Sequence, residues 1–282
     1  MSKVDINIIT RGNVSGGAKR EIANTLEDCY KHFGTKYPQK VEVFIAENEA
    51  MVADFIREEK FRLGIVDECY DECICSHDAW RGYPRITIAI ERFSKLKKLV
   101  KLGMLRHEAA HTALHGSLEY DIFHVSDECR QIALIKSIDM EVLELAVQYL
   151  SEAVKDCETT KFLVEHDYIN CQAAYALECV HPLDQDKLTR EPVKSERQAY
   201  FIYKTTLLRP LLFTNPLRSL PASKKLSREH KVMLDRKIEE IAELLGPNQN
   251  KLLQVAEKIA SGLTEDTHQN INLAARQAMF LA

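Results

Sequence analysis

Two hydrophobic periods alternate along the first 90 residues of the chain. Residues 5–10 and 40–46 alternate apolar and polar positions, as half-buried strands do. Residues 16–33 and 50–63 instead carry apolar residues at helical spacing, and each segment is followed by a glycine. The pattern therefore predicts a β-α-β-α beginning.

A third strand and a long helix follow this beginning. Residues 67–84 are irregular and rich in cysteine, aspartate and aromatic residues, and residues 85–90 then alternate isoleucine with smaller residues. Ser94 is the predicted N-cap of the next helix, whose apolar positions keep a 3.6-residue period as far as the natural stop at Gly116.

The second half of the chain carries the helical period almost throughout. Two polar connectors that contain proline, 181–195 and 214–227, separate its segments. The predicted helical segments are 126–179, 196–212, 228–245 and 250–282. Together with the strands before them, these segments predict an α+β protein with a mixed sheet and a mostly α-helical C-terminal half.

Composition narrows the class of function. The net charge of −4 gives no electrostatic reason to expect a nucleic-acid partner, and the basic run at 94–101 is explained as the solvated face of a helix. The N-terminus lacks the apolar core of a signal peptide, and no stretch approaches the ~20 apolar residues of a membrane span. We therefore expect a cytoplasmic protein without a membrane partner, whose eight cysteines are mostly reduced.

The predicted long helix contains the sequence His-Glu-Ala-Ala-His at 107–111, an HExxH motif. Residues four apart lie on one face of a helix, so the imidazoles of His107 and His111 can bind one metal ion. Glu108 is rotated by about 100° from His107 and can reach a metal-bound water without being a ligand. The motif predicts one zinc ion per chain, with His107 and His111 as ligands and Glu108 as catalytic base.

The motif and the order of elements over residues 1–180 resemble the zincin metallopeptidases. The resemblance implies an upper subdomain, 1–125, with the sheet and the HExxH helix, and a helical lower subdomain, 126–195, that supplies the third metal ligand. Residues 196–282 would form a helical extension. It also implies a peptide or protein substrate that lies antiparallel to an edge strand, which residues 85–90 match by position.

The third metal ligand cannot be read directly from the motif. His115 is excluded while the helix is regular, because eight residues of helix rise about 12 Å. The metzincin pattern HExxHxxGxxH fails at Leu114 and Ser117. The gluzincin pattern, in which an Asp follows a ligand Glu by four residues, resembles Glu152 and Asp156.

A helical wheel does not decide between these carboxylates. Glu152 lies opposite the main apolar stripe of its helix, and Asp156 falls between solvent and a second apolar edge. Glu158 borders the main stripe. We expect one acidic residue in 152–158 to bind the metal, with Glu152 and Asp156 as near equals and Glu158 third.

Two further groups of residues have more than one interpretation. Cys69, Cys73, Cys75 and His77 could bind a second, structural zinc ion, or they could belong to an irregular loop with partly buried thiols. Position alone makes His166, Tyr168, Tyr175 and His181 candidate oxyanion donors.

The predicted function is a zinc metallopeptidase that cleaves a peptide bond. The first alternative is a zincin-like binding or regulatory module without catalysis. The second is a helical interaction protein with an accidental HExxH sequence. The substrate and the oligomeric state stay open.

Overall fold

The computed structural model of the chain describes residues 4–34, 37–65, 74–180 and 193–282. The chain divides into two compact units, Met1–Asp121 and Ile122–Ala282. The described residues form one small mixed sheet and many helices, so the α+β class is confirmed. Within these residues, no helix combines the length and the apolar character that a membrane crossing requires.

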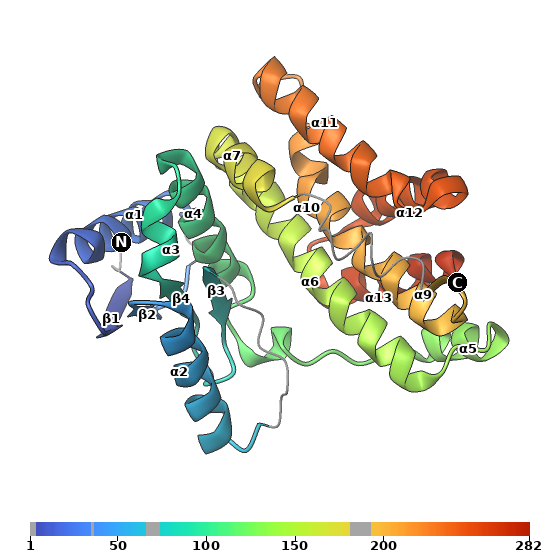
Figure 1. Cartoon of the computed structure of the whole chain (residues 1–282), viewed down its shortest axis with the longest axis horizontal. Helices are drawn as coiled ribbons and strands as arrows, with labels where there is room; N and C mark the ends of the chain where they lie inside the picture. Colours follow the sequence, from blue (N-terminus) through green and yellow to red (C-terminus); the bar gives the residue numbers. More distant parts are fainter. Residues whose placement is uncertain (1–3, 35–36, 66–73, 181–192) are drawn as a thin grey trace. The chain divides into compact units, whose positions relative to one another are not determined.

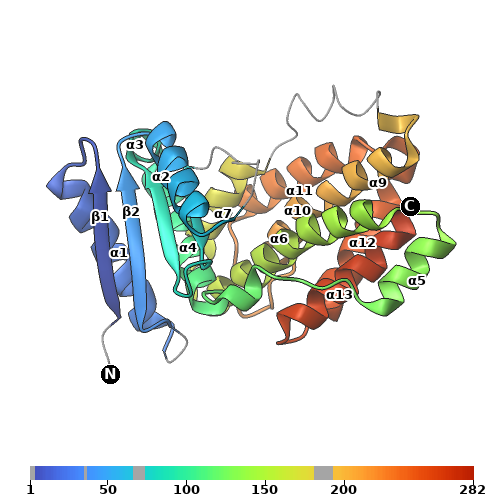
Figure 2. The same cartoon turned by 90° about the horizontal axis from the view of Figure 1, so that it is seen from below.

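The first unit contains a four-stranded sheet with the order β1-β2-β4-β3. The arrows of β1 and β2 point the same way in Figure 2, and β4 is parallel to β2. β3 pairs antiparallel to β4. The strands are β1 (Asp5–Arg11), β2 (Lys40–Ala46), β3 (Cys75–Asp78) and β4 (Arg85–Ala89).

Helices cover both faces of this sheet. Figure 1 shows α1 and α4 on one side and α2 on the other. Because side chains alternate along a strand, β2 buries apolar residues on both faces: Val43 and Ile45 on one, Phe44 on the other. The helices of this unit are α1 (Gly16–His32), α2 (Glu49–Arg62), α3 (Ile90–Lys95) and α4 (Lys98–Leu114).

Three sequence-based predictions for this unit are wrong. Residues 85–90 do not form an edge strand, because β4 lies between β2 and β3. β3 falls inside the stretch 67–84 that the pattern marks as irregular. Ser94 does not cap the long helix, since the short helix α3 contains it and α4 begins only after Lys97.

The second unit consists of helices around one core. The longest helix, α6, packs against α9, α10 and α13. Helices of the predicted segments 126–195 and 196–282 contribute to the same apolar cluster. The helices are α5 (Asp127–Ile135), α6 (Met140–Glu165), α7 (Ile169–Cys179), α9 (Arg197–Thr206), α10 (Leu208–Arg218), α11 (Arg228–Glu243), α12 (Gln249–Gly262) and α13 (Thr267–Ala278).

Two boundaries in this unit differ from the sequence prediction. α10 continues through Pro216, inside the predicted linker 214–227, because Leu217 is buried and holds that turn in the core. The predicted last helix is two helices, α12 and α13. The second begins at Thr267, after Asp266, whose carboxylate caps the helix by accepting a hydrogen bond from the backbone N–H of Gln269.

Candidate metal centre

The HExxH motif lies in the second half of α4, as its spacing predicts. All six residues from His107 to Thr112 are buried, although a helix on a surface would expose about half of them. α4 packs against α1, β3 and β4 within the first unit. The polar groups of the motif are therefore enclosed, and buried imidazoles and carboxylates need specific partners.

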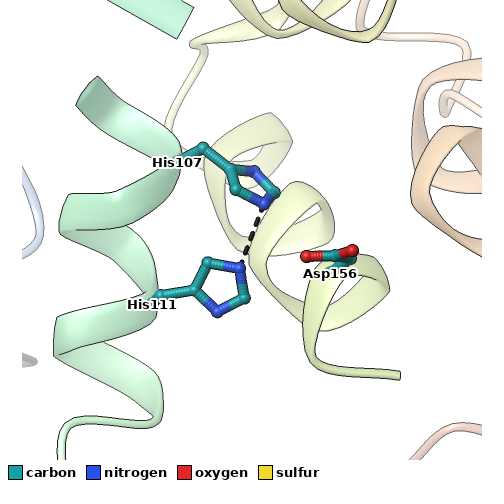
Figure 3. A group of neighbouring side chains, drawn as sticks. All are labelled: His107, His111 and Asp156. Atoms are coloured by element: carbon teal, nitrogen blue, oxygen red, sulfur yellow. Dashed lines mark hydrogen bonds between the residues drawn. The ribbon is translucent and has the colours of Figure 1, made fainter. Parts of the chain in front are cut away.

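The two histidines of the motif point their Nε2 atoms at each other. His107 Nε2 and His111 Nε2 lie 3.0 Å apart, and Figure 3 shows the two rings converging from successive turns of α4. Two imidazole ligands of a tetrahedral zinc ion, each at 2.0–2.1 Å, place their nitrogens about 3.4 Å apart. The pair therefore has nearly the spacing that one shared ion requires.

The other ring nitrogen of His111 faces His115. The two Nδ1 atoms lie 3.3 Å apart, and His115 is buried at the C-cap of α4. If His111 used Nε2 to bind a metal, its Nδ1–H would donate to His115 Nδ1, which fixes the tautomers of both rings. The geometry thus gives His115 an orienting role toward His111.

Glu108 lies on a different side of α4 and contacts β3. Its Oε2 accepts a hydrogen bond of 3.0 Å from His77 Nδ1. The same His77 ring stacks on His111, with centroids 4.0 Å apart and an interplanar angle of 12°. Sequence reasoning missed His77 as a neighbour of the motif, because its only sequence signal was a cluster of cysteines.

The predicted cysteine-histidine cluster lies only partly within the described residues. Cys75 and His77 are on β3, and Cys75 is buried. Cys69 and Cys73 lie outside the described residues. A second zinc site there stays a prediction, and the structure adds that His77 Nδ1 contacts Glu108.

The three candidate carboxylates of the second unit lie on α6. The helix is buried on more than one face, since Ser151 and the run from Ala153 to Cys157 are all buried. The helical wheel therefore could not rank these carboxylates by exposure. Asp156, which the wheel placed partly toward solvent, is only 7% exposed.

Each carboxylate has a different partner within the second unit. Asp156 Oδ2 accepts a hydrogen bond of 2.7 Å from Arg209 Nε on α10. Glu152 pairs with Lys155 Nζ at 2.7 Å. Glu158 accepts hydrogen bonds from Thr267 and Asn270, which join α6 to α13. Glu158 therefore links α6 to α13, as Asp156 links α6 to α10.

Nearby charges shift the pKa of Glu152 and that of Arg209. Burial alone would raise the pKa of Glu152, but the Lys155 ammonium and the Arg209 guanidinium lower it below its ordinary value. The Asp156 carboxylate raises the pKa of Arg209, so this guanidinium stays charged. An ionised carboxylate is the form that binds a metal.

The structure describes three of the four candidate oxyanion donors. His166 Nδ1 bonds to the Phe162 carbonyl oxygen at 2.8 Å, and its ring lies against the Phe162 ring. Tyr175 packs edge-on against Phe213, and the hydroxyl oxygen of Tyr168 is buried. His181 lies outside the described residues. These contacts within the second unit do not select a donor.

A buried charge network lies on the other face of the sheet. Arg85, 1% exposed, donates from Nε and Nη2 to Asp78 at 3.0 and 3.1 Å. Its Nη1 is 3.7 Å from Glu42 and 3.6 Å from Glu59. Burial raises the pKa of Asp78 to about 6, although Arg85 opposes this shift. The network fixes β3 beside β4.

Comparison with known proteins finds no family model that matches the chain, and neither the curated proteins nor the solved structures give a significant match.

Proposed function

We propose that this protein is a zinc-dependent hydrolase, and specifically a metallopeptidase. One observation carries the proposal: His107 Nε2 and His111 Nε2 converge to 3.0 Å inside a buried stretch of helix that also holds Glu108. Burial of two imidazoles and a carboxylate within five residues of one helix is unfavourable unless these groups have specific partners. A shared metal ion would be such a partner.

The donor set supports zinc and suggests Asp156 as the third ligand. His107, His111 and Asp156 are all buried, and each offers one atom that can bind a metal. Two imidazoles with one carboxylate form a common catalytic zinc set that leaves a position open. Each candidate on α6 also has a partner of its own: Arg209 for Asp156, Lys155 for Glu152, and α13 for Glu158.

The roles of the chain's own groups follow from this arrangement. Zinc, when bound, would act as a Lewis acid toward a water molecule and a substrate carbonyl. Glu108 would accept the proton of the attacking water and deliver it to the amine that leaves. The burial of the motif excludes bulk water, which strengthens the electrostatic interactions among these groups.

β3 is the strand that we propose for substrate binding. It lies at the end of the sheet, pairs with β4 on one side, and carries His77, which contacts Glu108. An extended peptide that added to the other side of β3 would gain main-chain hydrogen bonds. We therefore keep a peptide substrate in the proposal, but we propose that it pairs with β3 and not with β4. A cytoplasmic location, with reduced cysteines, remains part of the proposal.

Metal content and peptide cleavage test this function. Elemental analysis of the purified chain should give one zinc per molecule, and His107→Ala should lose it. Glu108→Gln should keep the zinc, because Glu108 is not a ligand. Its kcat on a peptide library should fall by about 100- to 10,000-fold, the range for loss of a general base.

The outcomes separate the alternatives. A wild-type chain that neither contains nor rebinds zinc would be evidence against the hydrolase and for an interaction protein. Stoichiometric zinc without cleavage of any peptide would favour a binding or regulatory module. Zinc that survives His107→Ala would place the metal elsewhere in the molecule.

A further inference from the structure

His77 and Glu108 reach each other from separate elements. His77 lies on β3 and Glu108 on α4, 31 positions apart. The Glu108 side chain is 6% exposed and the His77 side chain is 14% exposed. Because an ionised carboxylate only accepts hydrogen bonds, His77 Nδ1 carries the proton and donates it to Glu108 Oε2.

The His77 ring is fixed on two further sides. It stacks in parallel on His111, one of the proposed zinc ligands, at 4.0 Å. The residues on either side of His77 face the opposite surface of the sheet, where Ser76 bonds to Thr87 at 2.7 Å and Asp78 bonds to Arg85. Strand pairing opposite Ile86 therefore sets the position of the donor.

A glutamate side chain needs such a restraint if it is to act as a base. Three rotatable bonds separate its carboxylate from the backbone, and each has more than one accessible rotamer. A hydrogen bond to Oε2 removes this freedom and fixes the position at which the carboxylate would take the proton of an attacking water. A small misplacement of a reacting group can cost about 100-fold in rate.

We propose that His77 is a positioning residue that holds the Glu108 carboxylate in its reactive orientation through the Nδ1–H···Oε2 hydrogen bond. The proposal rests on the hydrolase function above. His77 neither binds the metal nor takes the proton of the water. That proton would go to the Glu108 carboxylate and then to the leaving amine.

Two substitutions separate the hydrogen bond from the stacked ring. In His77→Asn, the amide nitrogen is as many bonds from the backbone as Nδ1 and can donate in its place. In His77→Phe, an aromatic ring of similar size remains but the donor is lost. Thr87→Val is the matched control, because it removes the hydrogen bond to Ser76 on the opposite face of the sheet and lies on β4, outside the strand proposed for the substrate.

We expect the two His77 variants to differ in kcat. His77→Phe should lower kcat by about 10- to 100-fold with KM, zinc content and Tm near the wild-type values. His77→Asn should recover most of that loss, and Thr87→Val should keep wild-type activity. A loss of activity in His77→Asn without a loss in His77→Phe would show that the ring is what matters. Loss of zinc in both would make His77 a ligand. Either result overturns the proposal.

A spectroscopic measurement tests the hydrogen bond without any turnover. Long-range ¹H–¹⁵N NMR of the imidazoles should show a protonated Nδ1 in His77 of the wild-type chain. Glu108→Ala should move the proton toward Nε2. An unprotonated Nδ1, or a spectrum unchanged by Glu108→Ala, would overturn the proposal. Because this readout needs neither zinc nor substrate, its failure is distinct from failure of the hydrolase function.

Discussion

Tyr30 and Thr112, 82 positions apart in the chain, share a buried hydrogen bond of 2.7 Å between their hydroxyl groups. Thr112 also donates its single hydroxyl proton to the carbonyl oxygen of Ala109. Tyr30 must therefore be the donor in the shared bond. The bond ties α1 to the last turn of α4, directly after His111, and burial raises the pKa of the Tyr30 phenol.

This donor assignment predicts an asymmetry between two substitutions. Thr112→Val removes the acceptor and leaves a buried phenol proton without a partner, so it should cost about 2–3 kcal/mol of unfolding free energy. Tyr30→Phe leaves Thr112 bonded to Ala109 and should cost about 1 kcal/mol. Urea unfolding of both variants and of the double variant measures the difference. Equal costs would contradict the assigned direction.

Substitution of the acidic residues on α6 should identify the third ligand. Asp156→Asn should lower zinc affinity by about 100-fold or more, since even residues that only orient a ligand change it by about 10- to 100-fold. Competition with a fluorescent chelator measures the affinity, and circular dichroism confirms the fold.

The other two carboxylates supply the comparison for Asp156. Glu158→Gln should leave zinc affinity unchanged but lower the unfolding free energy by about 1–2 kcal/mol, because it weakens two hydrogen bonds to α13. Glu152→Gln should change neither quantity strongly. Loss of zinc in Glu152→Gln alone would transfer the ligand role to Glu152.

The raised pKa of Asp78 predicts a pH dependence of stability. With a pKa of about 6 in the folded chain and an ordinary value of 3.8, Asp78 binds more protons when folded between these two pH values. The contribution of Asp78 to the free energy of unfolding is therefore most favourable below pH 4 and is lost as the pH rises through 6. The loss approaches about 3 kcal/mol, because each pKa unit corresponds to about 1.4 kcal/mol.

The measurement compares wild type with Asp78→Asn, which cannot ionise. As the pH rises from 4 to 7, the unfolding free energy of the wild type should fall relative to that of Asp78→Asn. Other carboxylates titrate alike in both chains and cancel. A difference that is constant over this range would show that the Arg85 ion pair fully offsets the burial of Asp78.

Gly116, which follows the C-cap residue of α4, should not tolerate a side chain. A Cβ at this position would lie 2.2 Å from the Thr112 carbonyl oxygen and 3.1 Å from Pro84 Cβ. Gly116→Ala should therefore cost about 3 kcal/mol, the upper range for overpacking. Gly16→Ala, at the start of α1, meets only Arg20 at 3.8 Å and should be neutral or stabilise by up to about 1 kcal/mol. Thermal unfolding of the two variants checks the contrast.

Local patterns were sufficient for the elements with clear periods. The β-α-β-α beginning and the helix with His107 and His111 follow from spacing alone. β3 was missed because its four residues, Cys-Ser-His-Asp, carry no alternation, and its pairing with β4 makes it a strand. β4 was taken for the edge because β3 precedes it in sequence but lies outside it in the sheet.

Tertiary packing explains the remaining differences. One helix was predicted for 250–282, but Gly262 allows the chain to pass close to Leu273, which a Cβ would approach to 2.8 Å. The helical wheel of α6 failed because packing buries this helix on more than one face. His77 escaped notice for the same reason as β3, since only the folded sheet brings it to Glu108.

The alternation along β3 also protects the chain against misfolding. His77 contacts Glu108 on one face of the sheet, and Asp78 contacts Arg85 on the other. A shift of this strand by one residue would exchange the two faces. A shift in one direction would set Asp78 against Glu108, and a shift in the other direction would set the His77 imidazole against the Arg85 guanidinium. Either error carries an electrostatic cost, so the pairing that assembles the proposed catalytic base is also the one that folding favours.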